Sequence, residues 1–166
     1  MPKSDQVIDS NRYKIIPRTL IFIFRWNEVL LIKGGPQKRT WANLYNGIGG
    51  HIERGEDVTT SATRELEEET GLIVHDLGLV GTILVDANEM TGVGIFIMIG
   101  NYVNGEIRTS EEGLLEWVKM SDLERLPLVE DVKIILKQVA SMKANSPPFS
   151  ARSYYDENDH LQLLFG

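Results

Sequence analysis

The sequence contains no cysteine, which excludes disulfides, thiolate metal sites and a cysteine nucleophile. No apolar run approaches the roughly 18 residues that a membrane-spanning helix needs, so we expect no membrane association. The stretch MPKSDQVIDS at the start of the sequence holds no apolar segment of the kind found in secretory signals. The three histidines lack the spacing of a zinc site. We therefore expect a cytoplasmic protein without zinc or disulfides.

Basic residues are scarce relative to acidic ones. The chain holds 17 lysines and arginines against 24 aspartates and glutamates, which gives a net charge of -7. An acidic chain without a local basic face repels duplex phosphates, so duplex nucleic acid is not expected as a partner. The same repulsion acts on any polyphosphate substrate. An acidic enzyme that binds such a substrate therefore needs a divalent cation at its site.

The 166 residues fit one domain, 1–166, with an irregular lead-in over 1–16 and a C-terminal hairpin over 147–166. Hydrophobic periodicity predicts strands at 19–24, 29–33, 78–86, 93–103 and 114–119, and a return strand from Glu106 after the Asn104-Gly105 turn. Helices are predicted at 57–70 and 130–143, with a short helix between them that Ser121 and Glu124 open as a capping box. Mixed strands with two helices indicate an α/β or α+β sandwich.

The most informative segment is the acidic run in the first predicted helix. Glu65, Glu68 and Glu69 stand at i, i+3 and i+4 and share one helix face. Like charges at these spacings repel one another, and the C-terminal half of a helix disfavours anions. A bound divalent cation reverses both effects, because hard cations prefer carboxylate oxygens. The alternative is an ordinary solvated acidic face.

The surrounding residues resemble the Nudix box, whose pattern is G-x5-E-x7-R-E-U-x-E-E-x-G-U with U aliphatic. All nine specified positions match, at Gly50, Glu56, Arg64, Glu65, Leu66, Glu68, Glu69, Gly71 and Leu72. The resemblance implies an α/β/α sandwich with a mixed sheet and a loop–helix–loop catalytic motif. It is strong within the box and weaker over the rest of residues 17–165.

The resemblance also implies the site chemistry. Magnesium, or manganese in its place, would be coordinated by Glu65, Glu68 and Glu69, with the carbonyl of Gly49 as a further ligand. Arg64 would support catalysis by tying the box loop to the helix through Glu56, while Gly50 and Gly71 would be structural. Water would attack a phosphorus of the substrate after a carboxylate takes its proton.

The carboxylate that accepts this proton varies within the family. Glu65 is our first choice. Glu112 is the second, because it lies five residues before Trp117, where several Nudix enzymes supply an acid from outside the box. Its neighbour Glu111 is easily mistaken for it. The alternative for Glu112 is an exposed turn residue.

Outside the box, three features resemble the 8-oxo-dGTP diphosphatases of MutT and MTH type. Asn46 stands where these enzymes place an amide against the purine edge, and an amide suits that task because it offers both a donor and an acceptor. Glu130 and Asp131 loosely match their base-reading acids, although no aromatic residue accompanies them. The C-terminal hairpin recurs in the same branch. The alternatives are that Asn46 only satisfies a turn and that the two acids only favour a helix N-terminus.

These observations lead to a metal-dependent diphosphatase that converts a nucleoside triphosphate to a monophosphate and pyrophosphate, with 8-oxo-dGTP as the best single substrate. Lys33 is a further substrate-binding candidate for the phosphates, and Trp41 is either a base-stacking residue or, as we favour, part of the core. One alternative is a Nudix pyrophosphohydrolase for another nucleotide or a nucleotide sugar. Another is a non-catalytic nucleotide-binding domain, although such domains usually lose box carboxylates. A small nucleotide is the expected partner, and a homodimer is an open alternative.

Overall fold

The computed structural model describes residues 2, 9, 11–102, 104–108 and 112–166. The strands are β1 (Lys14–Arg25), β2 (Glu28–Gly34), β3 (Tyr45–Asn46), β4 (Gly78–Val85), β5 (Thr91–Asn101), β6 (Gly113–Lys119), β7 (Phe149–Tyr155) and β8 (Leu161–Phe165). The helices are α1 (Val58–Thr70), the 3-10 helix η2 (Met120–Arg125) and α2 (Glu130–Ser141). Within the described residues, no helix combines the length and the apolar character needed to cross a bilayer.

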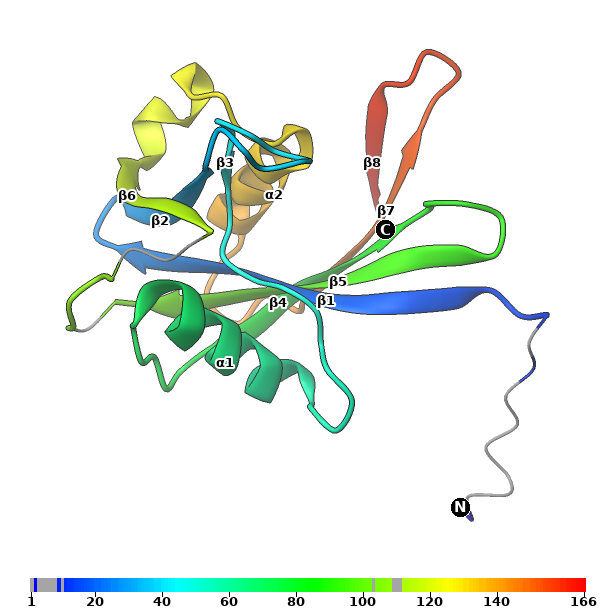
Figure 1. Cartoon of the computed structure of the whole chain (residues 1–166), viewed down its shortest axis with the longest axis horizontal. Helices are drawn as coiled ribbons and strands as arrows, with labels where there is room; N and C mark the ends of the chain where they lie inside the picture. Colours follow the sequence, from blue (N-terminus) through cyan, green and yellow to red (C-terminus); the bar gives the residue numbers. More distant parts are fainter. Residues whose placement is uncertain (1, 3–8, 10, 103, 109–111) are drawn as a thin grey trace.

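All eight strands belong to one mixed sheet with the order β3-β2-β1-β5-β4-β7-β8, and β6 pairs with β2. The pairs β1–β5 and β4–β7 are parallel, while the other pairs are antiparallel. Helices α1 and α2 lie on opposite sides of the central strands (Figure 1). This arrangement is the α/β/α sandwich with a mixed sheet that the sequence predicts.

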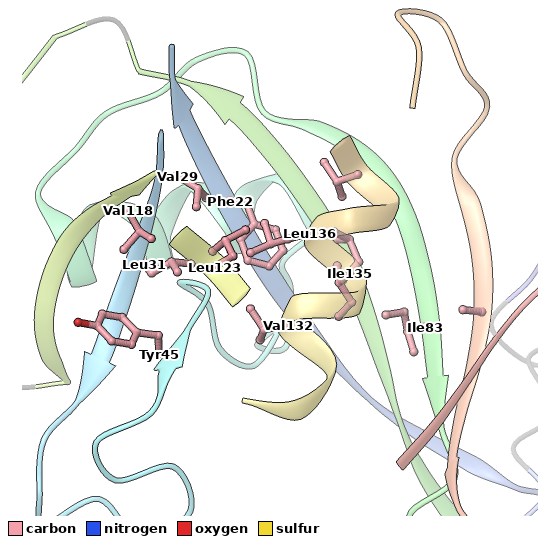
Figure 2. Packing of buried hydrophobic residues seen from close by; sticks show 13 residues of the cluster. Phe22, Val29, Leu31, Tyr45, Ile83, Val118, Leu123, Val132, Ile135 and Leu136 are labelled. Atoms are coloured by element: carbon pink, nitrogen blue, oxygen red, sulfur yellow. The ribbon is translucent and has the colours of Figure 1, made fainter. Parts of the chain in front are cut away.

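Successive side chains of β1 point to opposite faces of the sheet, so β1 contributes to two core clusters, one under each helix. Phe22 is fully buried in a cluster with Val132, Ile135 and Leu136 of α2 (Figure 2). Ile21 and Ile23 are buried in a second cluster that includes Ala62 and Leu66 of α1. Because successive strand side chains point to opposite faces, a strand that is apolar at every position requires cover on both sides. The unbroken apolar run in β1 therefore explains why helices pack on both faces.

The β1–β2 hairpin opens after a short paired stretch, and this opening creates room for a site. β1 and β2 pair only from Ile23–Leu30 to Arg25–Glu28. Further along, β2 pairs with β3 instead, at Ile32 and Lys33. The segment after β3 then returns to β1, where Ile48 bridges Ile21 and the Thr19 N–H donates to the Gly50 carbonyl at 2.9 Å. The start of the box thus lies along the edge that β1 exposes when it leaves β2.

Several predicted boundaries are wrong. The irregular lead-in does not extend to residue 16, because β1 begins at Lys14 and pairs there with Thr91 of β5. No strand begins at Glu106; Arg108 instead donates its N–H to the Thr70 carbonyl at 2.8 Å, which ties this segment to the end of α1. Residues 103 and 109–111, which include Glu111, lie outside the described residues.

The predicted capping box at Ser121 is also wrong. The short helix is η2, its N-cap is Lys119, and no side chain makes the capping hydrogen bond. Helix α2 ends at Ser141 rather than at 143. At the end of the chain, β7 and β8 pair as an antiparallel hairpin from Ala151–Phe165 to Tyr155–Leu161.

Candidate active site

Local capping sets the position of the acidic helix α1. Asp57 is the N-cap, and its Oδ1 accepts the N–H groups of Thr59 at 2.8 Å and Thr60 at 2.9 Å. Gly71 ends the helix in the left-handed conformation, with φ 72°, and donates its N–H to the Glu67 carbonyl. An acidic N-cap satisfies free helix N–H groups, and glycine adopts the left-handed C-terminal conformation without strain. The box residues between these caps therefore have fixed directions around the helix.

Arg64 connects the box loop to this helix. Its Nε donates to Glu56 Oε1 at 2.6 Å and its Nη2 donates to Glu56 Oε2 at 3.0 Å, a two-point contact that suits the planar guanidinium. Nη2 also donates to the carbonyl of His51 at 3.1 Å. The hydrogen bonds from Arg64 are the main reason that the pKa of Glu56 falls to about 2. The loop from His51 to Glu56 is therefore held against α1 mainly by Arg64, and the Ser61 hydroxyl adds a hydrogen bond to the His51 carbonyl at 3.3 Å.

Two glycines allow the backbone to come close to β1 and to the helix carboxylates. Gly49 has φ 143°, and a Cβ at this position would lie 2.2 Å from the carbonyl oxygen of Thr19. A Cβ at Gly50 would lie 2.4 Å from Glu65 Oε1. Neither distance is compatible with a side chain unless the surroundings shift. The absence of Cβ atoms is what lets β1, the loop and the Glu65 carboxylate meet.

The three box glutamates do not occupy equivalent places. Glu69 is half-buried and accepts the Gly49 N–H at 3.2 Å; burial raises its pKa to about 7, which the Gly49 N–H partly opposes. Arg64 Nη1 donates to Glu65 at 2.9 Å and to Glu68 at 3.1 Å. The side chain of Glu68 is 61% exposed, so it faces solvent. The three glutamates offer only carboxylate oxygens as ligands.

A divalent cation needs several oxygen ligands held close together. Hard cations take oxygen ligands, so the donor chemistry of the three glutamates fits magnesium or manganese. Within the described part of the chain, no three His, Cys, Asp or Glu side chains converge closely enough to form a metal cage. The carboxylates of Glu65 and Glu68 do not converge with that of Glu69 because both form ion pairs with the guanidinium of Arg64.

A cavity of about 500 Å³ opens beside the box. Cavities of this size hold nucleotide-sized ligands. Its lining combines strand, loop and helix residues, namely Arg18, Thr19, Leu20, Ile32, Trp41, Asn46, Gly47, Gly49, Gly50, His51, Glu53, Glu65, Glu69, Ile95, Glu112, Val129 and Asp131. Among the described residues of this lining, five carry carboxyl groups and two, Arg18 and His51, carry basic groups. A polyanion therefore enters this cavity favourably only if a cation accompanies it.

The cavity gathers some of the sequence-predicted residues but not others. Its lining includes Asn46, Gly49, Gly50, Glu65, Glu69, Glu112 and Asp131. Glu68 lies instead beside a shallow groove on the outer face of α1. Glu130, the first residue of α2, and Lys33 are not in the lining either, and the Lys33 ammonium lies 5.3 Å from the centroid of the Tyr45 ring.

Two residues of the cavity lining, Asp131 and Glu112, have surroundings that affect their carboxyl groups. Asp131 is half-buried at the start of α2, and burial is the main cause that raises its pKa. Glu112 forms an ion pair with Lys38, a residue of the loop between β2 and β3. This pair brings together residues that are 74 positions apart in the sequence.

The structure also brings in residues that sequence reasoning missed or misplaced. Arg18 lines the cavity, and its Nε lies 3.1 Å from His51 Nε2, within hydrogen-bonding distance. The only signal in the sequence was an arginine directly before the apolar run of β1. Trp41, which we expected to pack in the core, lines the cavity and remains partly exposed. The loop that carries it has no periodic pattern, so its direction was not readable from the sequence.

Comparisons with known proteins identify relatives of this chain. The family model described as the NUDIX domain matches residues 14–139. An oxidized purine nucleoside triphosphate hydrolase from Mus musculus is 36% identical over 109 residues, which cover 63% of this chain and 67% of the relative. An ADP-ribose pyrophosphatase from Methanocaldococcus jannaschii is 30% identical over 119 residues, which cover 70% of this chain and 68% of the relative.

Solved structures agree on the fold. The crystal structure of a mutator MutT protein from Bacillus halodurans superposes with a TM-score of 0.76 at 24% identity, over 91% of this chain and 97% of the other. The NUDIX domain of Shewanella oneidensis NrtR, crystallised with ADP ribose, gives a TM-score of 0.66 at 14% identity, over 84% and 97% of the two chains. With the family model matching most of the chain and every box position present, the protein belongs to the Nudix hydrolase family.

Proposed function

We propose that this protein hydrolyses a nucleoside triphosphate to a nucleoside monophosphate and pyrophosphate, with magnesium as its metal and 8-oxo-dGTP as its best substrate. The observation that carries the proposal is the composition of one cavity. Glu65 and Glu69 of the box line the same cavity as the amide of Asn46 and the carboxyl of Asp131. A nucleotide has the matching polarity, with a polyphosphate at one end and a hydrogen-bonding base at the other.

In this proposal the metal would be held by Glu65, Glu69 and the carbonyl of Gly49, with Glu68 joining them when its carboxylate leaves Arg64, and manganese can replace magnesium. When bound, such a cation neutralises phosphate charge and makes a bound water more acidic. The chain's own contribution is orientation. Arg64 holds the loop and helix together through Glu56, and the glycines let Glu65 and Glu69 approach the loop backbone.

Glu65 is the proposed proton acceptor for the attacking water, and Glu112 is the alternative. Both line the cavity. Glu65 lies against Gly50 and is oriented by Arg64, so its oxygens stand at the junction of loop and helix. Glu112 reaches the cavity from the start of β6 and is paired with Lys38. Because Glu65 is also a proposed metal ligand, Glu112→Gln is the variant that separates these roles. A kcat close to the wild-type value at saturating magnesium leaves Glu65 as the proton acceptor, whereas a loss of about 100-fold or more assigns that role to Glu112.

Asn46 and Asp131 are the proposed base-reading groups, with Glu130 and Lys33 as weaker substrate-binding candidates because they lie outside the cavity lining. Asn46 Oδ1 accepts the N–H of Gly47 at 2.8 Å, and its side-chain NH2 donates no hydrogen bond to another described residue. That NH2 is therefore available as a donor. Asp131 lines the same cavity, so its carboxylate oxygens can accept hydrogen bonds from the N–H groups of a purine edge.

The proposal draws further support from the identity to the oxidized purine nucleoside triphosphate hydrolase of Mus musculus. The relative from Methanocaldococcus jannaschii, named as an ADP-ribose pyrophosphatase, favours a nucleotide sugar as the second candidate. A substrate panel with magnesium decides between them. It should contain 8-oxo-dGTP, dGTP, ADP-ribose and diadenosine polyphosphates, with products identified by mass.

The expected outcome is a monophosphate and pyrophosphate from 8-oxo-dGTP, with the highest kcat/KM of the panel. A higher kcat/KM on ADP-ribose would replace the triphosphate assignment with the nucleotide-sugar one. If no member of the panel is hydrolysed with magnesium or manganese, the proposed function is wrong.

A further inference from the structure

We propose that Trp41 is the base-stacking residue of this cavity, supplied by the loop between β2 and β3. The inference rests on the proposed function and adds a specificity-determining residue to it. It concerns the planar part of the substrate, whereas the polar groups Asn46 and Asp131 concern only its edge.

The first observation is that Trp41 is the only phenylalanine, tyrosine or tryptophan among the described residues that line the cavity. The other large apolar residues in the lining are aliphatic: Leu20, Ile32, Ile95 and Val129. Position 128, just before Val129, holds leucine. Among the described lining residues, the indole of Trp41 is therefore the largest aromatic surface for a planar heterocycle, and the smaller ring of His51 is the other one.

The second observation is that Trp41 is held in place before any ligand binds. A Cβ at Gly34 would lie 2.6 Å from Cε3 of the Trp41 ring and 2.5 Å from the Trp41 carbonyl oxygen. The same carbonyl accepts the Leu44 N–H at 3.1 Å, and the Asn43 N–H donates to the Gly34 carbonyl at 3.0 Å. The indole thus packs directly on the end of β2, within a loop that is closed by backbone hydrogen bonds.

The third observation is the charge beside the ring. The Lys38 ammonium lies over the indole at 5.0 Å from its centroid, and the same ammonium pairs with Glu112. The cation adds to the ordering of the loop. Lys38 and Glu112 therefore connect the aromatic wall to the acidic part of the cavity.

These contacts explain how Trp41 can contribute to binding. An aromatic side chain that is already ordered loses little conformational freedom when a base stacks on it, so more of the stacking energy appears as affinity. Removing one base-stacking aromatic typically weakens binding about 5- to 100-fold. We expect this loss in KM, because stacking on the base is the same in the ground state and in the transition state.

Fluorescence tests the contact without relying on turnover. The chain has three tryptophans, so Trp26→Phe/Trp117→Phe leaves Trp41 as the sole emitter. This variant is titrated with 8-oxo-dGMP, which has no diphosphate linkage to hydrolyse, and separately with inorganic pyrophosphate. We expect saturable quenching of Trp41 emission by the nucleotide and none by pyrophosphate. Unchanged emission at nucleotide concentrations that calorimetry shows to be saturating would overturn the inference.

Steady-state kinetics of Trp41 variants is the second test. Trp41→Leu should raise KM for 8-oxo-dGTP about 5- to 100-fold while kcat changes less than threefold, and Trp41→Phe should restore most of the affinity. Trp26→Phe is the matched control, because Trp26 is 95% exposed and absent from the cavity lining. If Trp41→Leu does not fold, the fluorescence arm decides alone.

The two proposals fail in different ways. If the wild-type protein hydrolyses nucleoside triphosphates, but Trp41→Leu keeps KM within twofold and Trp41 emission is insensitive to 8-oxo-dGMP, the stacking role is wrong and the proposed function stands. If the wild-type protein neither binds nor hydrolyses any nucleotide of the panel, both are wrong.

Discussion

Arg64 and Glu56 form the contact that organises the box. Two guanidinium nitrogens meet the two carboxylate oxygens at 2.6 and 3.0 Å, across eight positions of sequence. The remaining nitrogen, Nη1, reaches Glu65 and Glu68, so the loop, the helix and two box carboxylates share one cation. Structural support and catalytic chemistry are therefore coupled in this segment.

Acid should weaken the loop–helix connection through Glu56. The folded-state pKa of about 2 lies below the ordinary value of 4.5, so this carboxylate stabilises the fold above pH 4.5 and loses its contribution as the pH falls from 4.5 to 2. The groups around it are Arg64, the Glu53 N–H and Ser61. The difference in Tm between wild type and Glu56→Gln should therefore be largest above pH 4.5 and shrink toward pH 2. Glu89→Gln, in an exposed loop, should show no such trend. A difference that stays constant across this range would contradict the assignment.

Replacing Glu69 with Gln should reduce kcat more than tenfold and leave the fold intact. The two side chains have nearly the same shape, and the amide removes only the negative charge that a divalent cation needs. Glu67→Gln is the matched control, since Glu67 is an exposed neighbour outside the cavity lining. Activity above a tenth of the wild-type value in Glu69→Gln, at equal Tm, would show that Glu69 is not a metal ligand.

Replacing Asn46 with Ala should raise KM for a purine triphosphate by roughly tenfold and lower kcat far less. The reason is that Asn46 lines the cavity and carries an NH2 group available for the base edge. Asn101→Ala, at the exposed end of β5, should leave KM unchanged. Steady-state kinetics with 8-oxo-dGTP measures both variants, and an unchanged KM in Asn46→Ala removes this residue from base recognition.

The two loop glycines should respond differently to alanine. At Gly50 the three atoms nearest to the added Cβ all belong to the flexible carboxylate of Glu65, so we expect at least a tenfold loss of activity with little change in Tm. At Gly49 the Cβ meets the Thr19 backbone, and φ is positive, so Tm should fall by at least about 4 °C. Thermal denaturation and kcat on the two variants check this contrast. Equal losses of Tm in Gly49→Ala and Gly50→Ala would show that the Glu65 side chain cannot move away from the added Cβ at position 50.

The order of strands and helices was largely readable from the sequence because it depends on local patterns. The unbroken apolar run of β1 and the amphipathic stripe of α2 both predict burial without knowledge of a partner. Where prediction failed, a distant contact decided the outcome. Residues 14–16 became strand because β5 pairs with them, and the segment at Glu106 stayed irregular because Arg108 bonds to the end of α1.

The sequence by itself determined the box. Its spacing, its N-cap at Asp57 and its C-cap at Gly71 all act within a single helix and the loop before it, so the positions of Glu65, Glu68 and Glu69 around the helix axis follow from helical geometry, while hydrogen bonds to Arg64 set where the carboxylates of Glu65 and Glu68 lie. The tertiary structure decided which residues surround that helix. β1 leaves β2 after a short paired stretch, and only this opening places Arg18, Trp41 and Asp131 around one cavity. Contacts between residues so far apart in the sequence depend on strand pairing and packing, which no local pattern encodes.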